Sequence, residues 1–139
     1  MSTLKKLFLI DDDEDDRLIF HEALHELNLA VECYYAPDAV TALTKLQENS
    51  LVLPDYIFLD LNMPTITGRQ FLVTLKQTAA FRHIPVVILS TSQNPHDIEE
   101  TKQLGAFHFI IKPSTVKELS RRLAHVFSKN GHSTNGTGE

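Results

Sequence analysis

Leu7-Phe8-Leu9-Ile10-Asp11-Asp12 is an apolar run that ends in two adjacent carboxylates, and it sets the pattern for the rest of the chain. Later apolar runs also end in polar side chains: Tyr56-Ile57-Phe58-Leu59 before Asp60, Val86-Val87-Ile88-Leu89 before Ser90, and residues 107–111 before Lys112-Pro113. Runs without polar alternation are typical of strands buried on both faces, as parallel strands between helices are. Because parallel strands end on one edge of a sheet, where ligands bind, we expect three carboxylates, a hydroxyl and an ammonium group to converge there.

Amphipathic stretches alternate with the apolar runs along the whole chain, without an internal repeat. The predicted strands cover residues 6–11, 31–36, 55–60, 85–89 and 107–111, and the predicted helices cover 15–28, 38–48, 66–77, 95–104 and 115–128. Five strand–helix units predict a doubly wound α/β sandwich, a flavodoxin-like (βα)5 fold. Right-handed crossovers reduce the possible strand orders. We expect the order 2-1-3-4-5, in which Asp12 and Asp60 face each other across the switch point between strands 1 and 3.

Local signals mark several element boundaries. Asn94-Pro95 is typical of a helix N-cap followed by proline at the first helical position, and Gly105 is typical of the residue just after a helix. The helix between them has few apolar residues, chiefly Ile98 and Leu104, so we expect it to be weakly anchored. Residues 129–139 contain no apolar side chain, so we expect one domain over residues 1–128 and a disordered tail over 129–139.

The composition restricts the class of protein. A chain of 139 residues with 42% apolar and 22% charged residues suits one globular domain. The net charge of −5 and the lack of a basic block argue against nucleic-acid binding. No apolar stretch approaches the roughly 18 residues that span a membrane, and no signal peptide is recognisable. The single cysteine, Cys33, excludes an internal disulfide and is expected to be buried and inert, so we expect a cytoplasmic protein.

The expected group of acids needs compensation. Asp11, Asp12 and Asp60 carry a formal charge of −3, and Lys112 returns one positive charge. A divalent cation would bring the sum to zero, and oxygen ligands suit Mg²⁺, with Mn²⁺ chemically acceptable. Asp60 can then attack phosphorus as a carboxylate nucleophile, while Lys112 and the metal stabilise the transferring phosphoryl group and Ser90 donates to one of its oxygens.

Three other motifs give weaker interpretations. His21-Glu22-Ala23-Leu24-His25 has the H-E-x-x-H form of zinc proteases, but on a helix both histidines point away from the apolar face and no third ligand is evident. Residues 11–22 imitate an EF-hand loop, but Asp16 replaces the glycine that the turn requires, and the preceding run looks like a strand. A flavin carrier of this fold would need a phosphate-cradling loop after the first strand, where this chain is acidic and lacks glycine.

In order and spacing, the strand-end motifs resemble those of response-regulator receiver domains, the CheY-like family whose strand order is the one predicted here. The resemblance covers about residues 5–128 and rests on Leu9-Ile10-Asp11-Asp12-Asp13, Leu59-Asp60-Leu61-Asn62-Met63-Pro64, Ile88-Leu89-Ser90-Thr91 and Ile110-Ile111-Lys112-Pro113.

The resemblance implies roles for the acidic residues. By position, Asp60 is the phosphoacceptor. Asp12 corresponds to the direct metal ligand, and Asp11 to its partner, which often acts through water. Asn62 matches the position whose backbone carbonyl completes the Mg²⁺ site, to which Asp60 also contributes.

The resemblance also implies a switch. Ser90 corresponds to the switch hydroxyl and Lys112 to the lysine that contacts the phosphate. Phe109 falls at the switch aromatic, for which a plain core position is the alternative. Gly68 matches the family glycine near the third helix.

A receiver-like chain implies a two-component response regulator that takes a phosphoryl group from a sensor histidine kinase and is no enzyme beyond its own phosphotransfer. Residues 11–17 further resemble small single-domain receivers, some of which partner with phytochrome-type or other hybrid kinases. No output domain follows residue 128, so we expect signalling by contact with a downstream protein, without nucleic acid or membrane. Homodimerisation stays open, and Ser114, where many members have an apolar residue, leaves the partner surfaces open too. A scaffold that works without phosphorylation is the alternative, against which the complete acid group argues.

Overall fold

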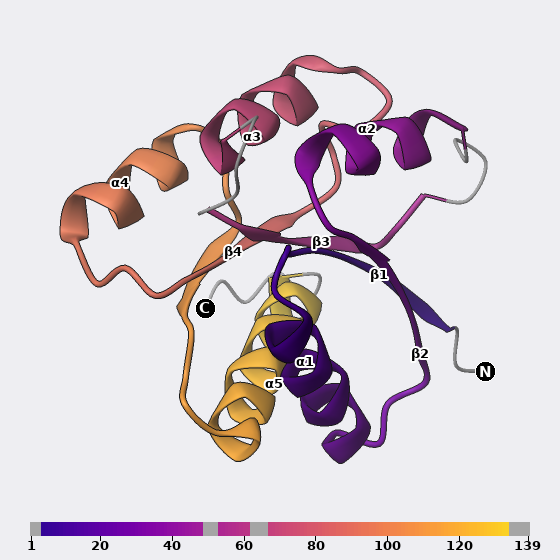
Figure 1. The fold of residues 1–139 in the computed structure, drawn as a ribbon, viewed down its shortest axis with the longest axis vertical. Coiled ribbons are helices and arrows are strands. Elements are labelled where there is room, and N and C mark those ends of the chain that lie inside the picture. The colour runs from indigo at the N-terminus through magenta and orange to yellow at the C-terminus, as the bar shows by residue number, and fades with distance from the viewer. Residues whose placement is uncertain (1–3, 49–52, 62–66, 134–139) are drawn as a thin grey trace.

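The computed structural model describes residues 4–48, 53–61 and 67–133, which form alternating strands and helices (Figure 1). The strands are β1 (Lys5–Ile10), β2 (Val31–Ala36), β3 (Tyr56–Asp60), β4 (Val86–Ser90) and β5 (His108–Ile111). The helices are α1 (Glu14–Glu26), α2 (Ala39–Glu48), α3 (Gly68–Gln77), α4 (Pro95–Gln103) and α5 (Val116–Ser133). None of the helices described here combines the length and the apolar character needed to cross a bilayer.

The strands form one parallel sheet in the order β2-β1-β3-β4-β5, which confirms the predicted topology. The register sets Asp60 beside Leu89 and Ser90 beside Ile111. The polar residues that end these strands therefore lie next to one another along a single edge of the sheet.

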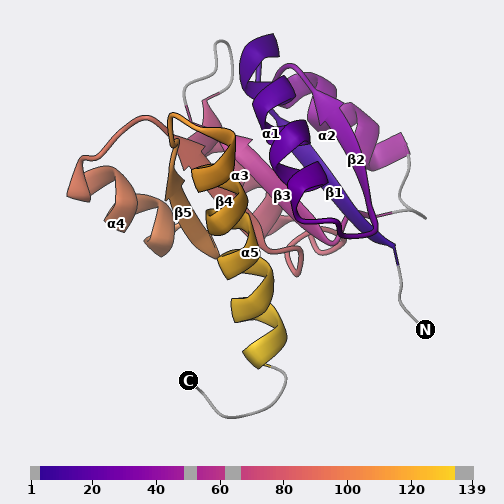
Figure 2. The ribbon, with the colours of Figure 1, turned by 90° about the horizontal axis from the view of Figure 1, so that it is seen from below.

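Helices cover both faces of the sheet, with α1 and α5 on one face and α2, α3 and α4 on the other (Figures 1 and 2). Alternate residues of each central strand serve the two faces. Phe8 and Ile57 belong to the core that includes α2 and α3, whereas Leu7 and Phe58 belong to the core that includes α1 and α5. These four side chains are at most 3% exposed, and burying each contributes about 2 kcal/mol. The sheet edge that carries the polar residues is thus supported from both sides.

The boundaries of α4 confirm the local signals in the sequence. Asn94 is the N-cap, and its side chain accepts a hydrogen bond from the N–H of His96 at 2.9 Å. Pro95 is the first helical residue, and Gly105 follows the C-cap with φ of 111°. A positive φ is adopted by glycine at little cost, which explains why the helix ends there.

Helix α5 ends at Ser133, whereas the sequence predicted an end at residue 128, so this boundary is wrong. The extended part of the helix includes a contact that apolar periodicity does not predict. The Nζ of Lys129 lies 5.7 Å from the centroid of the Phe107 ring, a cation–π contact that ties the polar end of the helix to the segment before β5. The rest of the predicted tail, residues 134–139, lies outside the described residues.

Cys33, on β2, is half-buried instead of fully buried as predicted. Burial nevertheless raises the pKa of its thiol to about 11. Because the thiolate is the reactive form, the thiol is a poor nucleophile at neutral pH.

Candidate functional site

The carboxylates of Asp11, Asp12 and Asp60 meet at the carboxyl edge of the sheet. One oxygen from each lies within 4.8 Å of the others. Asp11 directly follows β1 and is 1% exposed, Asp60 ends β3 and is 4% exposed, and Asp12 is exposed to solvent. The predicted group of three acids is therefore present, with two members withdrawn from water and one facing it.

Asp11 is a poorly solvated acid. Burial raises the pKa of Asp11 from 3.8 to about 6, and the charge of Asp60 adds to that rise. The N–H of Asp13, which donates to Asp11 Oδ1 at 2.9 Å, and the ammonium of Lys112 oppose the rise without cancelling it. Burial thus disfavours the charged form of Asp11 more than its hydrogen bond and Lys112 favour it.

Lys112 reaches the acids from the end of β5, as predicted. Its Nζ lies 3.2 Å from Asp11 Oδ2 and 3.5 Å from Asp60 Oδ2. The closest contact, however, is to Asp16 Oδ2 at 2.7 Å. Burial alone would lower the pKa of Lys112, but the hydrogen bond to Asp16 and the charges of Asp11 and Asp60 outweigh it and raise the pKa above its ordinary value. Lys112 is therefore charged and shared among three carboxylates.

The start of α1 contributes more to the site than the sequence indicated. Asp13 is the N-cap, with its side chain accepting from the N–H groups of Asp15 and Asp16. Arg17 donates through Nη1 to the backbone oxygen of Asp11 at 2.8 Å. Acidic side chains in the first turn of a helix also interact favourably with the positive end of the helix dipole. The signal in the sequence was the short distance along the chain from β1 to α1. It keeps the first turn of α1, with Asp16, close to the end of the strand.

Ser90 is completely buried at the end of β4, one residue beyond the partner of Asp60 in the register. Its Oγ accepts a hydrogen bond from the N–H of Ser92 at 3.0 Å. Phe109 lies beside Ile88 in the register and is half-buried against the core that includes α2 and α3. Asn62, predicted to complete the metal site, lies outside the described residues.

Gly68 begins α3 in close contact with the end of β3. A Cβ at this position would lie 2.8 Å from Leu61 Cα and 2.9 Å from the backbone oxygen of Asp60. The preceding Thr67 forms a capping box with Gln70. The lack of a side chain thus lets α3 begin against the backbone of Asp60, which is a structural reason for glycine here.

The weaker motifs fall elsewhere in the molecule. His21 and His25 are exposed on α1, on the side opposite the buried Phe20, Ala23 and Leu24, as the helical spacing predicted. His21 Nδ1 lies 3.5 Å from the Tyr35 hydroxyl. The run before the acids is strand β1, not the helix that an EF-hand requires.

The acidic group fits a hard divalent cation. Three carboxylates within reach of one ion supply oxygen ligands, which such cations prefer. A bound cation would favour the charged form of Asp11, which burial disfavours. Exposed Asp12 leaves one side open to water, which Mg²⁺-type sites retain among their ligands.

Comparison with known proteins agrees with this geometry. Residues 7–124 match the family of response regulator receiver domains. The chain belongs to this family. As a receiver domain it is a two-component response regulator, and its acidic group is a divalent-cation site.

Curated relatives of this receiver domain cover most of its length. Response regulator Rcp1 from Synechocystis is 31% identical over an alignment of 129 residues that covers 89% of this chain and 87% of Rcp1. Chemotaxis protein CheY from Pseudomonas aeruginosa is 27% identical over 124 residues, 89% of this chain and 97% of that protein.

Solved structures similar to this receiver domain include two states relevant to the site. The phosphorylated cyanobacterial phytochrome response regulator RcpA has a TM-score of 0.80 and 32% identity, covering 89% of this chain and 91% of that chain. The Mn²⁺-bound form of Rcp1 has a TM-score of 0.77 and 30% identity, covering 89% and 92%. One relative thus carries a phosphoryl group and another a divalent metal.

Proposed function

We propose that Asp60 accepts a phosphoryl group from the phosphohistidine of a sensor histidine kinase, with Mg²⁺ as the cation. The observation that carries the proposal is the convergence of three carboxylates within 4.8 Å beside the Lys112 ammonium, at the edge where β1, β3, β4 and β5 end. The phosphorylated state of RcpA and the Mn²⁺-bound state of Rcp1 support it by analogy.

The chemistry follows from what each side chain can do. A carboxylate oxygen of Asp60 forms a bond to phosphorus while the bond from phosphorus to the donor imidazole nitrogen breaks and its electron pair stays on that nitrogen. Lys112, already 3.5 Å from Asp60, balances the negative charge of the incoming group. Ser90 donates its hydroxyl hydrogen to a phosphoryl oxygen. A bound Mg²⁺ supplies two positive charges that offset the acids and the phosphoryl oxygens.

Asp11 and Asp12 hold the cation together with Asp60, and the backbone carbonyl of Asn62 completes the set by analogy with the family. The all-oxygen donor set and the solvent-facing side suit Mg²⁺, and Mn²⁺ is chemically acceptable at the same ligands. The chain transfers no group beyond its own phosphorylation, so we class it as a phosphoacceptor and not as an enzyme.

The proposed partners follow from that role. The donor is a histidine kinase, of the phytochrome type or another hybrid type, by analogy with RcpA. The signal passes to a downstream protein by direct contact. A cytoplasmic location stays a prediction, which the unpaired Cys33 supports.

Acetyl phosphate with Mg²⁺ tests the proposal, with intact mass as the readout. The wild type should gain the mass of one phosphoryl group, and Asp60→Asn should not. Asp55→Asn is the matched control, because Asp55 lies just before the opposite end of the same strand and accepts from the N–H of Lys6 there. Equal labelling of wild type and Asp60→Asn would exclude Asp60 as the acceptor.

A further inference from the structure

Helix α4 has little apolar contact with the rest of the molecule. Within α4, all of whose residues are described, Thr101 is the only buried side chain. Its hydroxyl is used inside the helix, donating to the backbone oxygens of Asp97 and Ile98. The position of α4 therefore depends strongly on polar contacts.

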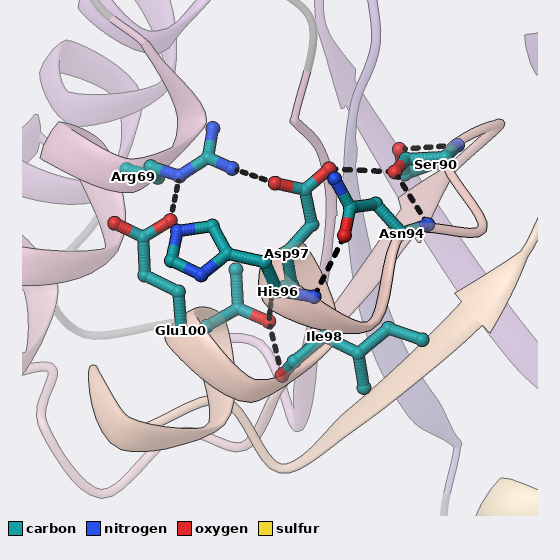
Figure 3. Close-up of polar contacts among 9 residues, drawn as sticks. Arg69, Ser90, Asn94, His96, Asp97, Ile98 and Glu100 are labelled. Carbon is teal, nitrogen blue, oxygen red and sulfur yellow. Dashed lines mark hydrogen bonds and ion pairs between the residues drawn. The ribbon is translucent and has the colours of Figure 1, made fainter.

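Arg69 of α3 provides the main polar contact to α4 (Figure 3). Its Nη2 lies 2.6 Å from Asp97 Oδ1, and its Nε lies 2.5 Å from Glu100 Oε1. The two acids are one helical turn apart, so one planar guanidinium spans both. The Arg69 and Asp97 side chains are 33% and 22% exposed, which leaves this pair only partly screened by water.

Asp97 uses its second oxygen in the opposite direction, toward the site. Ser92 donates its hydroxyl to Asp97 Oδ2 at 2.6 Å, and the N–H of Ser92 donates to Ser90 Oγ at 3.0 Å. A hydroxyl oxygen that accepts one hydrogen bond can still donate its own hydrogen. Ser92 thus fixes the position of the Ser90 oxygen and leaves its hydrogen for a phosphoryl group.

Arg69 is itself placed by the phosphoacceptor strand. It follows Gly68, where a Cβ would collide with the backbone of Asp60 and Leu61. The contacts therefore form a ring: from Asp60 through the start of α3 to Asp97, and back through the β4–α4 turn to Ser90, which ends the neighbouring strand.

We propose that Asp97 is a positioning residue for phosphoryl transfer, because it fixes, through Ser92, the turn that presents the Ser90 hydroxyl. Arg69 acts one step further away as the group that holds Asp97. The inference rests on the proposed function, in which Ser90 donates to the phosphoryl group. A partner protein that separates Asp97 from Arg69 should weaken phosphoryl binding. Because coupling between two binding events is reciprocal, phosphorylation should weaken the binding of that partner by the same factor.

The test uses the full chain and two ligands, measured by calorimetry: Mg²⁺ alone, and beryllofluoride, a phosphoryl mimic, in saturating Mg²⁺. Asp97→Asn and Ser92→Ala should each weaken beryllofluoride binding about fivefold and leave Mg²⁺ binding within about twofold, because neither residue touches the acids. Arg69→Gln should weaken beryllofluoride similarly, and Arg69→Lys, which keeps a charge for Asp97, should recover part of the loss. A general loss of structure would lower both affinities together.

Glu99→Gln is the matched control, since it removes the same charge from the same helix and Glu99 pairs with Gln103 instead of the turn. It should leave both affinities unchanged. An equal effect of Glu99→Gln would overturn the proposal, as would wild-type beryllofluoride affinity in both Asp97→Asn and Ser92→Ala. Should Asp97→Asn fail to fold, Ser92→Ala and Arg69→Gln decide the question. A wild type that binds Mg²⁺ but no beryllofluoride would instead contradict the proposed function.

Discussion

Helices α4 and α5 precede and follow the same strand, β5, but they are held in different ways. Helix α5 buries Leu119, Leu123 and Val126, and Phe127 meets the Tyr56 ring edge-on at a centroid distance of 5.1 Å. Helix α4 buries a single threonine and relies on Arg69. Apolar packing resists small local changes, whereas a few ion pairs can be exchanged at little cost. The contrast indicates that α4 can respond to the site and that α5 is part of the frame.

The largest expected effect tests this contrast in the cores. Leu123→Ala should lower the free energy of unfolding by about 3 kcal/mol, because Leu123 is completely buried. Ile98→Ala in α4 should cost only about 1 kcal/mol, because Ile98 is half-exposed. Urea denaturation of both variants measures the difference. Equal losses would remove the basis for treating the two helices differently.

The next effect concerns Asp11, just before α1, where burial disfavours the charged form of the carboxyl group. The pKa of Asp11 is about 6 in the folded state and 3.8 as a reference for the unfolded one. The folded state therefore binds more protons between these values, so this contribution to stability is greatest below pH 4 and is lost as pH rises through 6. Without bound metal, the free energy of unfolding should fall by about 3 kcal/mol in total over this pH range.

Asp11→Asn removes that charge and should abolish this part of the pH dependence. At pH 7.5 without Mg²⁺ it should be more stable than the wild type by about 2 kcal/mol, since some hydrogen bonding to the carboxylate is lost. Saturating Mg²⁺ should reduce this difference in stability, because it should stabilise only the wild type. Urea denaturation at a series of pH values provides the measurement, and parallel curves for the two proteins would refute the assignment to Asp11.

The smallest effect addresses the end of α5. Lys129→Ala removes the contact with Phe107 and should cost about 0.5 kcal/mol, confined to the last turns of the helix. Hydrogen exchange of the amides near residues 126–133 should accelerate, while exchange around Leu123 stays unchanged. Lys117→Ala, an exposed lysine at the other end of α5, is the control. If these amides exchanged in Lys129→Ala as slowly as in the wild type, another contact would have to hold the end of α5.

The sequence was sufficient for the strands, their order and the three acids with Lys112. Each depends on short apolar runs and on the rule that parallel strands end together, so backbone topology alone brings Asp60 and Asp11 to one edge. Topology does not specify which carboxylate a flexible lysine approaches most closely. The contact between Lys112 and Asp16 therefore emerged only with the side chains in place.

The same limit explains why the ion pairs of Arg69 could not be predicted from the sequence. Its partners Asp97 and Glu100 lie 28 and 31 residues away, and all three are long or charged side chains on polar helix surfaces. Periodicity predicts which face of a helix is apolar, but ion pairs across the polar faces depend on rotamers and on the angle between helices. The weak apolar anchoring of α4 was predictable; the residue that compensates for it was not.

The protonated thiol of Cys33 has a practical consequence for following α4. The thiolate is the form of cysteine that attacks maleimide reagents, so at neutral pH the native Cys33 should react slowly. The substitution His96→Cys would introduce a second thiol on α4 that faces solvent. This thiol should react with a fluorescent maleimide before Cys33 does, so Cys33 need not be replaced. The chain is thus already suited to carrying an optical reporter on its most responsive helix.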